Sequence, residues 1–204
     1  MRESDIEKLD YICITHGHAD HCASAIPLAK KTGAKVVAIN ELTQLLVKDG
    51  LSNTQVETMD KGGILMLGED PQIGIALTQA IHSSAYQAAD GQNHYAGDAC
   101  GFIIQLESGR TIYYSGDTTI FGDMELIGDL FTPTVALLSI GGRFSMDPFL
   151  AAHATSLIES EYVIPIHYET YDTLPGKVEE FCQYLNEMPG VSVKPLKPGE
   201  EFSF

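Results

Sequence analysis

The sequence predicts one α/β layered domain that spans residues 1–204. Apolar segments of strand length alternate with segments of helical pattern in both halves of the chain, which is typical of strands and helices packed in layers. The chain has 204 residues, 44% of them hydrophobic, which is enough for a sizeable core. The sequence contains no internal repeat, linker or low-complexity segment that would mark a second domain.

The first half is expected to begin with a strand at Tyr11–Ile14 and a helix over residues 22–31, in which Pro27 must lie near the first turn. We expect Asn40 to cap a helix that ends at Gly50. Further strands are expected at Lys35–Ile39, Gln55–Met59, Ile64–Leu67 and Ile73–Ile81, and a polar loop at residues 83–98.

The second half is expected to begin with a hairpin that turns at Ser108-Gly109. Asp147-Pro148 is typical of a helix start, with Asp as N-cap and Pro at the first helical position. A further helix is expected near residues 175–187. Strands are expected at Phe102–Leu106, Thr111–Tyr114, Val135–Ile140, Tyr162–Ile166 and Val191–Val193.

Acidic residues dominate the charge, with 28 Asp and Glu against 12 Lys and Arg and a formal net charge of −16. Such a surface repels phosphate backbones, which argues against long nucleic acids and anionic membranes as partners. The four cysteines form no C-x-x-C pair, and the N-terminus shows no signal peptide, so we expect reduced thiols in a cytoplasmic protein. Its expected partner is a small-molecule substrate; whether it forms a homo-oligomer stays open.

Four residues of types that bind metals lie within six positions where the first strand ends: His16, His18, Asp20 and His21. Imidazole nitrogens and carboxylate oxygens are the donors that zinc prefers together with thiolates. Residues two apart in an extended chain point the same way, so His16 and His18 are expected to grip one ion. After a turn at the small residues, Asp20 and His21 are expected to face a second ion. A solvated polar loop is the alternative.

Three later positions also follow apolar strands: His82, Asp117 and His167. Ligands at the same ends of neighbouring strands converge on one cleft, and a carboxylate such as Asp117 is able to bridge two ions. The alternatives are a surface-loop histidine at His82 and an ordinary turn aspartate at Asp117.

These residues resemble the metallo-β-lactamase superfamily, whose H-x-H-x-D-H run corresponds to His16, His18, Asp20 and His21. The stretches at 139–148 and 163–168 look like the UPF0173 group of metal-dependent hydrolases, relatives of ascorbate-6-phosphate lactonase. The resemblance implies a four-layer αββα sandwich with its metals at one edge of the two sheets. It also implies that His16, His18 and His82 hold one metal, that Asp20, His21 and His167 hold the other, and that Asp117 bridges them.

The leading hypothesis is hydrolysis of an ester, lactone or phosphoester by a hydroxide that bridges two divalent ions, with zinc first and manganese or iron as alternatives. Besides binding metal, Asp20 and Asp117 are the expected catalytic residues, and Asp20 is placed to orient the nucleophile or take its proton. The rivals are a phosphodiesterase or nuclease of the same superfamily, an iron redox protein, and a non-catalytic metal-binding protein. The acidic charge argues against a nuclease.

Several other residues have both a functional and a structural interpretation. His94, Arg143 and Tyr168 are each candidates for contact with substrate, and each is equally explained as a surface or packing residue. His153 is expected to be structural, and Cys22 a packed thiol.

Only 15 residues precede His16, which is room for one strand. Members of the superfamily normally have several strands before this motif. We therefore expect the chain to lack a few dozen natural N-terminal residues and its first sheet to lack its N-terminal strands, which would expose a sheet edge.

Overall fold

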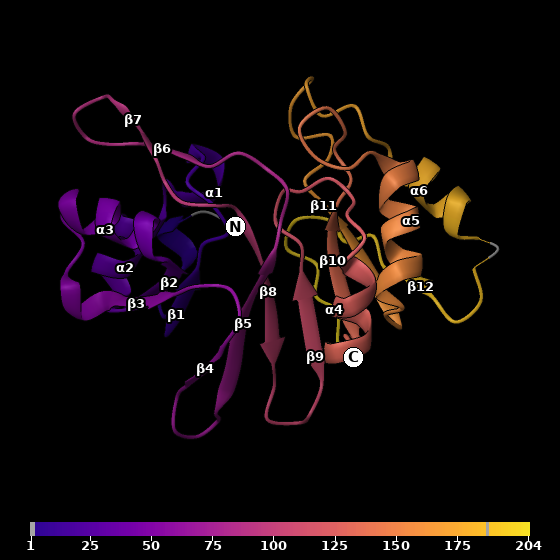
Figure 1. Ribbon diagram of the computed structural model, residues 1–204, viewed down its shortest axis with the longest axis horizontal. Coiled ribbons are helices and arrows are strands. Elements are labelled where there is room, and N and C mark those ends of the chain that lie inside the picture. The colour runs from indigo at the N-terminus through magenta and orange to yellow at the C-terminus, as the bar shows by residue number, and fades with distance from the viewer. Residues whose placement is uncertain (1–2, 187) are drawn as a thin grey trace. The chain divides into compact units, whose positions relative to one another are not determined.

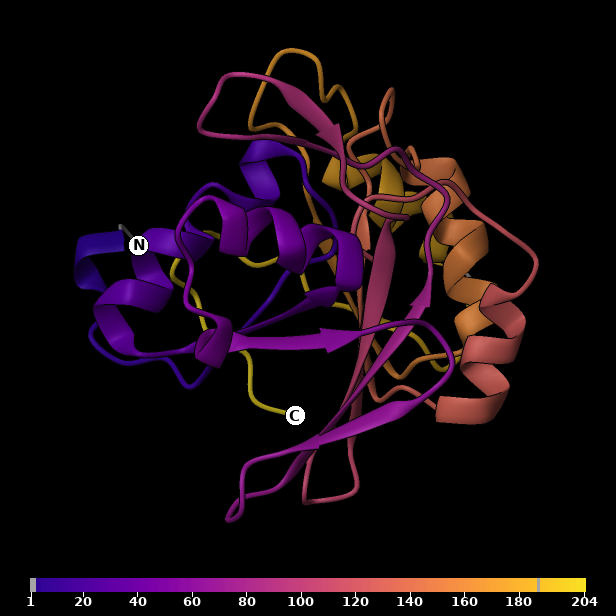
Figure 2. The same cartoon turned by 60° about the vertical axis from the view of Figure 1, so that its left-hand side comes forward.

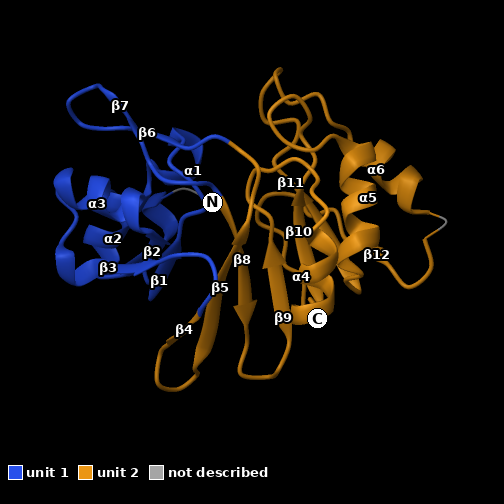
Figure 3. Cartoon of the chain, viewed as in Figure 1, with its two compact units in different colours: residues 1–63, 83–99 blue, residues 64–82, 100–204 orange. Residues whose placement is uncertain are grey.

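The computed structural model describes residues 3–186 and 188–204, and it confirms the expected α/β class (Figure 1). The chain divides into two compact units (Figure 3). Unit 1 comprises residues 1–63 and 83–99, and unit 2 comprises residues 64–82 and 100–204. Among the described residues, no helix combines the length and the apolar character needed to cross a membrane.

Unit 1 is built on a three-stranded parallel sheet in the order β1-β2-β3. Its strands are β1 (Tyr11–Cys13), β2 (Lys35–Ile39) and β3 (Val56–Met59), with a separate antiparallel pair of β6 (Ala85–Gln87) and β7 (Asn93–Tyr95). Its helices are α1 (Ala19–Cys22), α2 (Ala25–Thr32) and α3 (Asn40–Lys48), with 3-10 turns at Glu3–Asp5 and Asn53–Gln55. In the described part of the chain, β1 is the one strand before His16, as expected.

The core of unit 1 forms where α2 and α3 pack on β2. Val36 and Ala38 of β2 are fully buried, and they share one cluster with Ala29 of α2 and with Leu42 and Leu46 of α3. The leucines four apart lie on one face of α3, so a single stripe of the helix is buried.

Unit 2 holds a seven-stranded mixed sheet in the order β12-β11-β10-β9-β8-β5-β4. Strands β9 to β12 run parallel, and β4, β5, β8 and β9 pair antiparallel. The strands are β4 (Ile64–Leu67), β5 (Ile73–Gln79), β8 (Cys100–Gln105), β9 (Thr111–Tyr114), β10 (Val135–Ser139), β11 (Tyr162–Ile166) and β12 (Ser192–Val193). The helices are α4 (Met124–Phe131), α5 (Pro148–Ile158) and α6 (Val178–Leu185).

Helices α4, α5 and α6 of unit 2 lie beside one another along the sheet (Figure 2). Each contributes to one buried cluster: Met124 from α4, Ala154 from α5 and Phe181 from α6, packed against Leu138 of β10 and Val163 of β11. This packing leaves the carboxyl ends of the parallel strands to the loops, and the parallel arrangement therefore gathers those loops at one edge of the sheet.

Most predicted elements are confirmed, but the helix expected over residues 22–31 begins only at Ala25, after a break that separates it from α1, and other details also differ. Asn40 was wrongly expected as a cap: β2 runs directly into α3, Ile39 is the N-cap residue, and Asn40 is already helical. The loop predicted at residues 83–98 contains the short pair β6 and β7, whose three-residue strands are too brief to show an apolar period. Helix α4 was not predicted, because Gly128 in its middle disfavours helix.

Candidate metal centre

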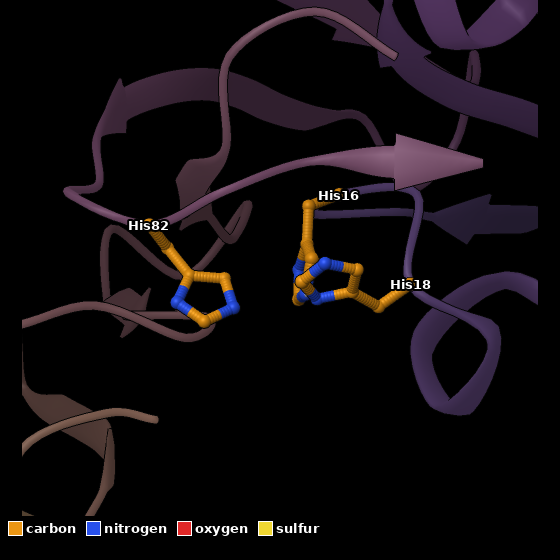
Figure 4. A group of neighbouring side chains, drawn as sticks. All are labelled: His16, His18 and His82. Carbon is orange, nitrogen blue, oxygen red and sulfur yellow. The ribbon is translucent and has the colours of Figure 1, made fainter. Parts of the chain in front are cut away.

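The first ligand candidates of unit 1 follow β1 directly. The Ile14 amide donates to the Val37 carbonyl at 3.0 Å, which extends the pairing of β1 with β2 by one residue. His16 is completely buried, and its Nδ1 lies 3.0 Å from the Thr15 hydroxyl. That contact fixes the ring so that Nε2 on its opposite side meets Nδ1 of His18 at 2.9 Å (Figure 4). Two imidazole nitrogens at one point fit a shared proton or a metal ion.

Asp20 and His21 lie on α1, one turn beyond His18. The His21 ring is tilted against the His16 ring with their centroids 4.2 Å apart. His21 Nε2 is 3.5 Å from Asp20 Oδ2. The turn therefore groups all four side chains of the motif within unit 1, as the spacing predicted.

Gly17 allows this tight path between His16 and His18. A Cβ at Gly17 would lie 2.8 Å from Cβ of Ala96 and 3.0 Å from the carbonyl of Ala85. Its amide donates to the Ser84 hydroxyl at 3.2 Å, and its carbonyl accepts from the Cys22 thiol at 3.1 Å. The segment that contains β6 and β7 thus packs directly against Gly17. Only a residue without a side chain fits at this position.

Cys22 packs as a thiol in this core and does not point to metal chemistry. It is buried, and burial followed by the nearby charge of Asp20 raises the pKa of its thiol to about 11. The neutral form therefore prevails near pH 7.

The ligand candidates of unit 2 come from three separated segments. Asp117 follows β9 and is only 4% exposed. Its Oδ2 lies 3.8 Å from Nε2 of His82 and 3.6 Å from Nε2 of His167. His82 follows β5, and His167 follows β11. Two imidazoles thus face a single carboxylate oxygen, as expected from the shared placement at strand ends.

His167 is held in a strained backbone conformation. Its φ is 55°, in the left-handed region, which costs a residue other than glycine on the order of 1–3 kcal/mol. A Cβ at Gly141 would lie 2.3 Å from the His167 carbonyl oxygen, so the glycine is what lets the loop after β10 approach. Packing against the loop after β10 therefore stabilises His167 in this strained conformation.

The donor set fits a divalent cation. Keeping a carboxylate as buried as Asp117 ionised is costly unless cations or hydrogen-bond donors compensate it. Imidazole nitrogens and carboxylate oxygens are zinc donors, and a bound cation would offset the negative charge of the carboxylate. The chain thus contains groups of histidine and aspartate side chains able to hold a metal ion.

The three candidates for contact with substrate lie in different surroundings. His94 of β7 has its Nε2 3.7 Å from Oδ2 of Asp90. The Arg143 guanidinium lies over the Phe144 ring at 5.0 Å. Tyr168 packs against the core of unit 2.

His153 is exposed on α5, with its ring edge-on to Phe149. Gly141, beside which the His167 carbonyl lies, was not among the site residues predicted from the sequence, because this contact joins segments far apart in the chain. The glycine pair after the strand Val135–Ile140 was the one available signal.

Comparison with known families identifies relatives that are metal-dependent hydrolases. The family model described as Beta-lactamase superfamily domain matches residues 1–168. A UPF0173 metal-dependent hydrolase of Rubrobacter xylanophilus is 44% identical over 194 residues, which covers 95% of this chain and 78% of that protein.

Solved structures give the same fold. Igni18, a metallo hydrolase from the archaeon Ignicoccus hospitalis, matches with a TM-score of 0.81 and 36% identity, over 95% of this chain and 80% of that one. The metallo-beta-lactamase fold protein YhfI from Bacillus subtilis has a TM-score of 0.65 at 14% identity, over 93% of this chain and 75% of that one, a likeness of fold alone. The expected metallo-β-lactamase fold is confirmed.

Proposed function

The chain belongs to the β-lactamase superfamily and, within it, to the UPF0173 metal-dependent hydrolases, and from that premise we propose that it hydrolyses a small-molecule ester, lactone or phosphoester at a centre of two divalent ions. Zinc is the first choice for both ions, with manganese or iron as alternatives. The observation that carries the proposal is the buried Asp117 carboxylate, whose Oδ2 lies within 3.8 Å of two imidazoles.

The proposed ligand sets follow the family pattern. His16, His18 and His82 hold one ion, while Asp20, His21 and His167 hold the other. Asp117 serves both. Divalent ions, when bound, acidify a water molecule and offset the negative charge that develops on the substrate.

The protein side chains have separate tasks in this proposal. Asp117 is buried and faces two histidines, which suits a residue that holds charge in place and does not exchange protons with solvent. The Asp20 side chain is 43% exposed and lies beside His21, so it is accessible to take a proton from an attacking water. The contact between Thr15 and His16 keeps the ring of His16 in one orientation.

The proposed substrate is small and anionic. A net charge of −16 disfavours long nucleic acids, whereas a pair of cations in the site attracts an anionic group locally. All four cysteines are free thiols, which supports a reducing compartment such as the cytoplasm. A non-catalytic metal-binding protein is the alternative that the substrate test below addresses.

A substrate panel tests the proposal. Zinc-reconstituted protein is assayed with aryl esters, lactones, phosphomonoesters and phosphodiesters, before and after treatment with a chelator. We expect at least one small substrate to be hydrolysed, with activity lost on chelation and restored by zinc. Hydrolysis of oligonucleotides alone would favour the nuclease alternative, and metal binding without any hydrolysis would favour the non-catalytic one.

A further inference from the structure

Thr118 follows Asp117 directly and joins two of the segments that carry ligand candidates in unit 2. It is completely buried. Its hydroxyl oxygen accepts from the Ile81 amide at 2.9 Å, and the same hydroxyl donates to the Thr119 carbonyl at 2.7 Å. Ile81 immediately precedes His82, and Thr118 immediately follows Asp117. The Thr118 side chain therefore links the segments of these two candidate ligands.

Two backbone hydrogen bonds further hold residues 118 and 119, one to Ile81 and one to Met146. The Thr119 amide donates to the Ile81 carbonyl at 3.2 Å, and the Met146 amide donates to the Thr118 carbonyl at 2.9 Å. The paired ladder of β5 with β8 ends at Gln79, so Ile81 lies beyond the regular hydrogen bonds of the sheet. Contacts with residues 118 and 119 therefore hold this stretch of chain where the sheet no longer does.

The hydroxyl is the part of Thr118 that matters in this arrangement. It serves as acceptor and donor at once, and valine has nearly the same shape but neither capacity. Without the acceptor, the Ile81 amide keeps no side-chain partner at this position. His82 Nε2 and Asp117 Oδ2, now 3.8 Å apart, would then be linked less tightly.

We propose that Thr118 is a positioning residue whose hydroxyl fixes the separation of His82 and Asp117 and thereby raises the metal affinity of the centre. This inference rests on the proposed function, because it assigns both neighbours as metal ligands. Residues that orient ligands from behind typically change metal affinity about 10- to 100-fold when they are removed.

The test compares Thr118→Val and Thr118→Ser with a matched control, Thr155→Val. Thr155 is also completely buried, and its hydroxyl donates to the Ala151 carbonyl at 2.9 Å inside α5, away from the ligand segments. Zinc affinity is measured by competition with a chromophoric chelator. Amide hydrogen exchange at Ile81 is measured on metal-free protein, which makes that readout independent of activity and of metal.

We expect Thr118→Val to weaken zinc binding about 10- to 100-fold and to speed exchange at Ile81, while Thr118→Ser and Thr155→Val stay close to the wild type. Unchanged zinc affinity in Thr118→Val, or an equal loss in Thr118→Ser, would overturn the inference and leave the proposed function intact. Wild-type protein that binds no zinc would instead overturn the proposed function. Unchanged exchange at Ile81 in Thr118→Val would overturn the positioning role in either case.

Discussion

The two units present their ligand candidates in different ways. In unit 1 the four candidates lie within six consecutive residues, and a local turn groups them. In unit 2 the three candidates are 35 and 50 residues apart (82 to 117 and 117 to 167), and the order of strands in the sheet groups them. The first arrangement depends on close packing at one glycine, whereas the second depends on several loops holding their positions together.

Replacing Asp117 should have the largest effect. Asp117→Asn keeps the size of the side chain and removes the charge that His82 and His167 face. Mutation of a residue that only orients a ligand typically lowers metal affinity or activity about 10- to 100-fold. For Asp117, a proposed ligand itself, we therefore expect the rate of hydrolysis to fall by more than about 100-fold. Both ions should bind more weakly, whereas His18→Ala should weaken one. Rate and zinc titration are the measurements.

The control for Asp117 is His153→Ala, since His153 is exposed on α5 and contacts Phe149. It should leave the rate and the zinc affinity near those of the wild type. Equal losses in Asp117→Asn and His153→Ala would mean that the site has been misplaced.

Metal binding should stabilise the folded protein measurably. An ion that binds only the folded state adds about 2.7 kcal/mol at a concentration 100 times its Kd. We therefore expect the Tm of metal-free protein to rise on addition of zinc and to return to its starting value with chelator. In Asp117→Asn the rise should be much smaller at the same zinc concentration. A Tm that does not respond to zinc in wild-type protein would contradict a specific site.

Glycine substitutions compare how the two units support their ligands. At Gly17 an added Cβ meets Cβ of Ala96 at 2.8 Å, and at Gly141 it meets the His167 carbonyl at 2.3 Å. Overpacking of this kind typically costs about 1–3 kcal/mol. Gly141→Ala should cost more, because its added Cβ lies only 2.3 Å from a backbone oxygen, whereas the backbone atoms nearest to a Cβ at Gly17 are 3.0 Å away. Zinc affinity should fall in both variants, because each moves a ligand segment.

Each glycine variant has a control in its own unit. A Cβ at Gly63 in unit 1 or at Gly122 in unit 2 meets nothing within 4 Å, and neither glycine has a positive φ. Denaturant unfolding of the alanine variants at these sites should give free energies close to that of the wild type. If Gly141→Ala matched Gly122→Ala, the loop after β10 would have more freedom than its contacts indicate.

The smallest expected effects concern helix starts. Asp147 caps α5, and its Oδ1 accepts from the Leu150 amide at 2.8 Å, so Asp147→Ala should lower the free energy of unfolding by about 1 kcal/mol. Asn40 lies inside α3 and not at its N-cap position, and Asn40→Ala should therefore stay within about 0.5 kcal/mol of the wild type. A larger loss for Asn40→Ala would restore its predicted role as cap.

The sequence was sufficient for the family and for most elements. The H-x-H-x-D-H run predicted a β-lactamase superfamily member, and that resemblance is confirmed. Strands such as β10 (Val135–Ser139) and β11 (Tyr162–Ile166) were predicted because apolar runs of strand length carry a clear signal. Asp147-Pro148 was identified as a helix start because capping is a local property.

What the sequence did not predict depends on contacts between distant segments. Nothing in the sequence distinguishes Thr118 from other residues after a turn, because the amide that donates to its hydroxyl, that of Ile81, lies 37 residues away in the chain. The requirement for glycine at position 141 follows only from the structure, in which the His167 carbonyl lies too close to leave room for a side chain. Helix α4 was missed because Gly128 disfavours helix, yet a Cβ there would lie 2.7 Å from the Ile158 carbonyl, so packing against α5 requires the glycine.

The most direct test of the central claim is the number of metal ions per chain. Protein purified without chelator and reconstituted with zinc is freed of unbound metal, and its zinc content is determined by elemental analysis. Seven ligand candidates with one shared carboxylate predict two zinc ions per wild-type chain. A ratio of one or less after full reconstitution would contradict the account.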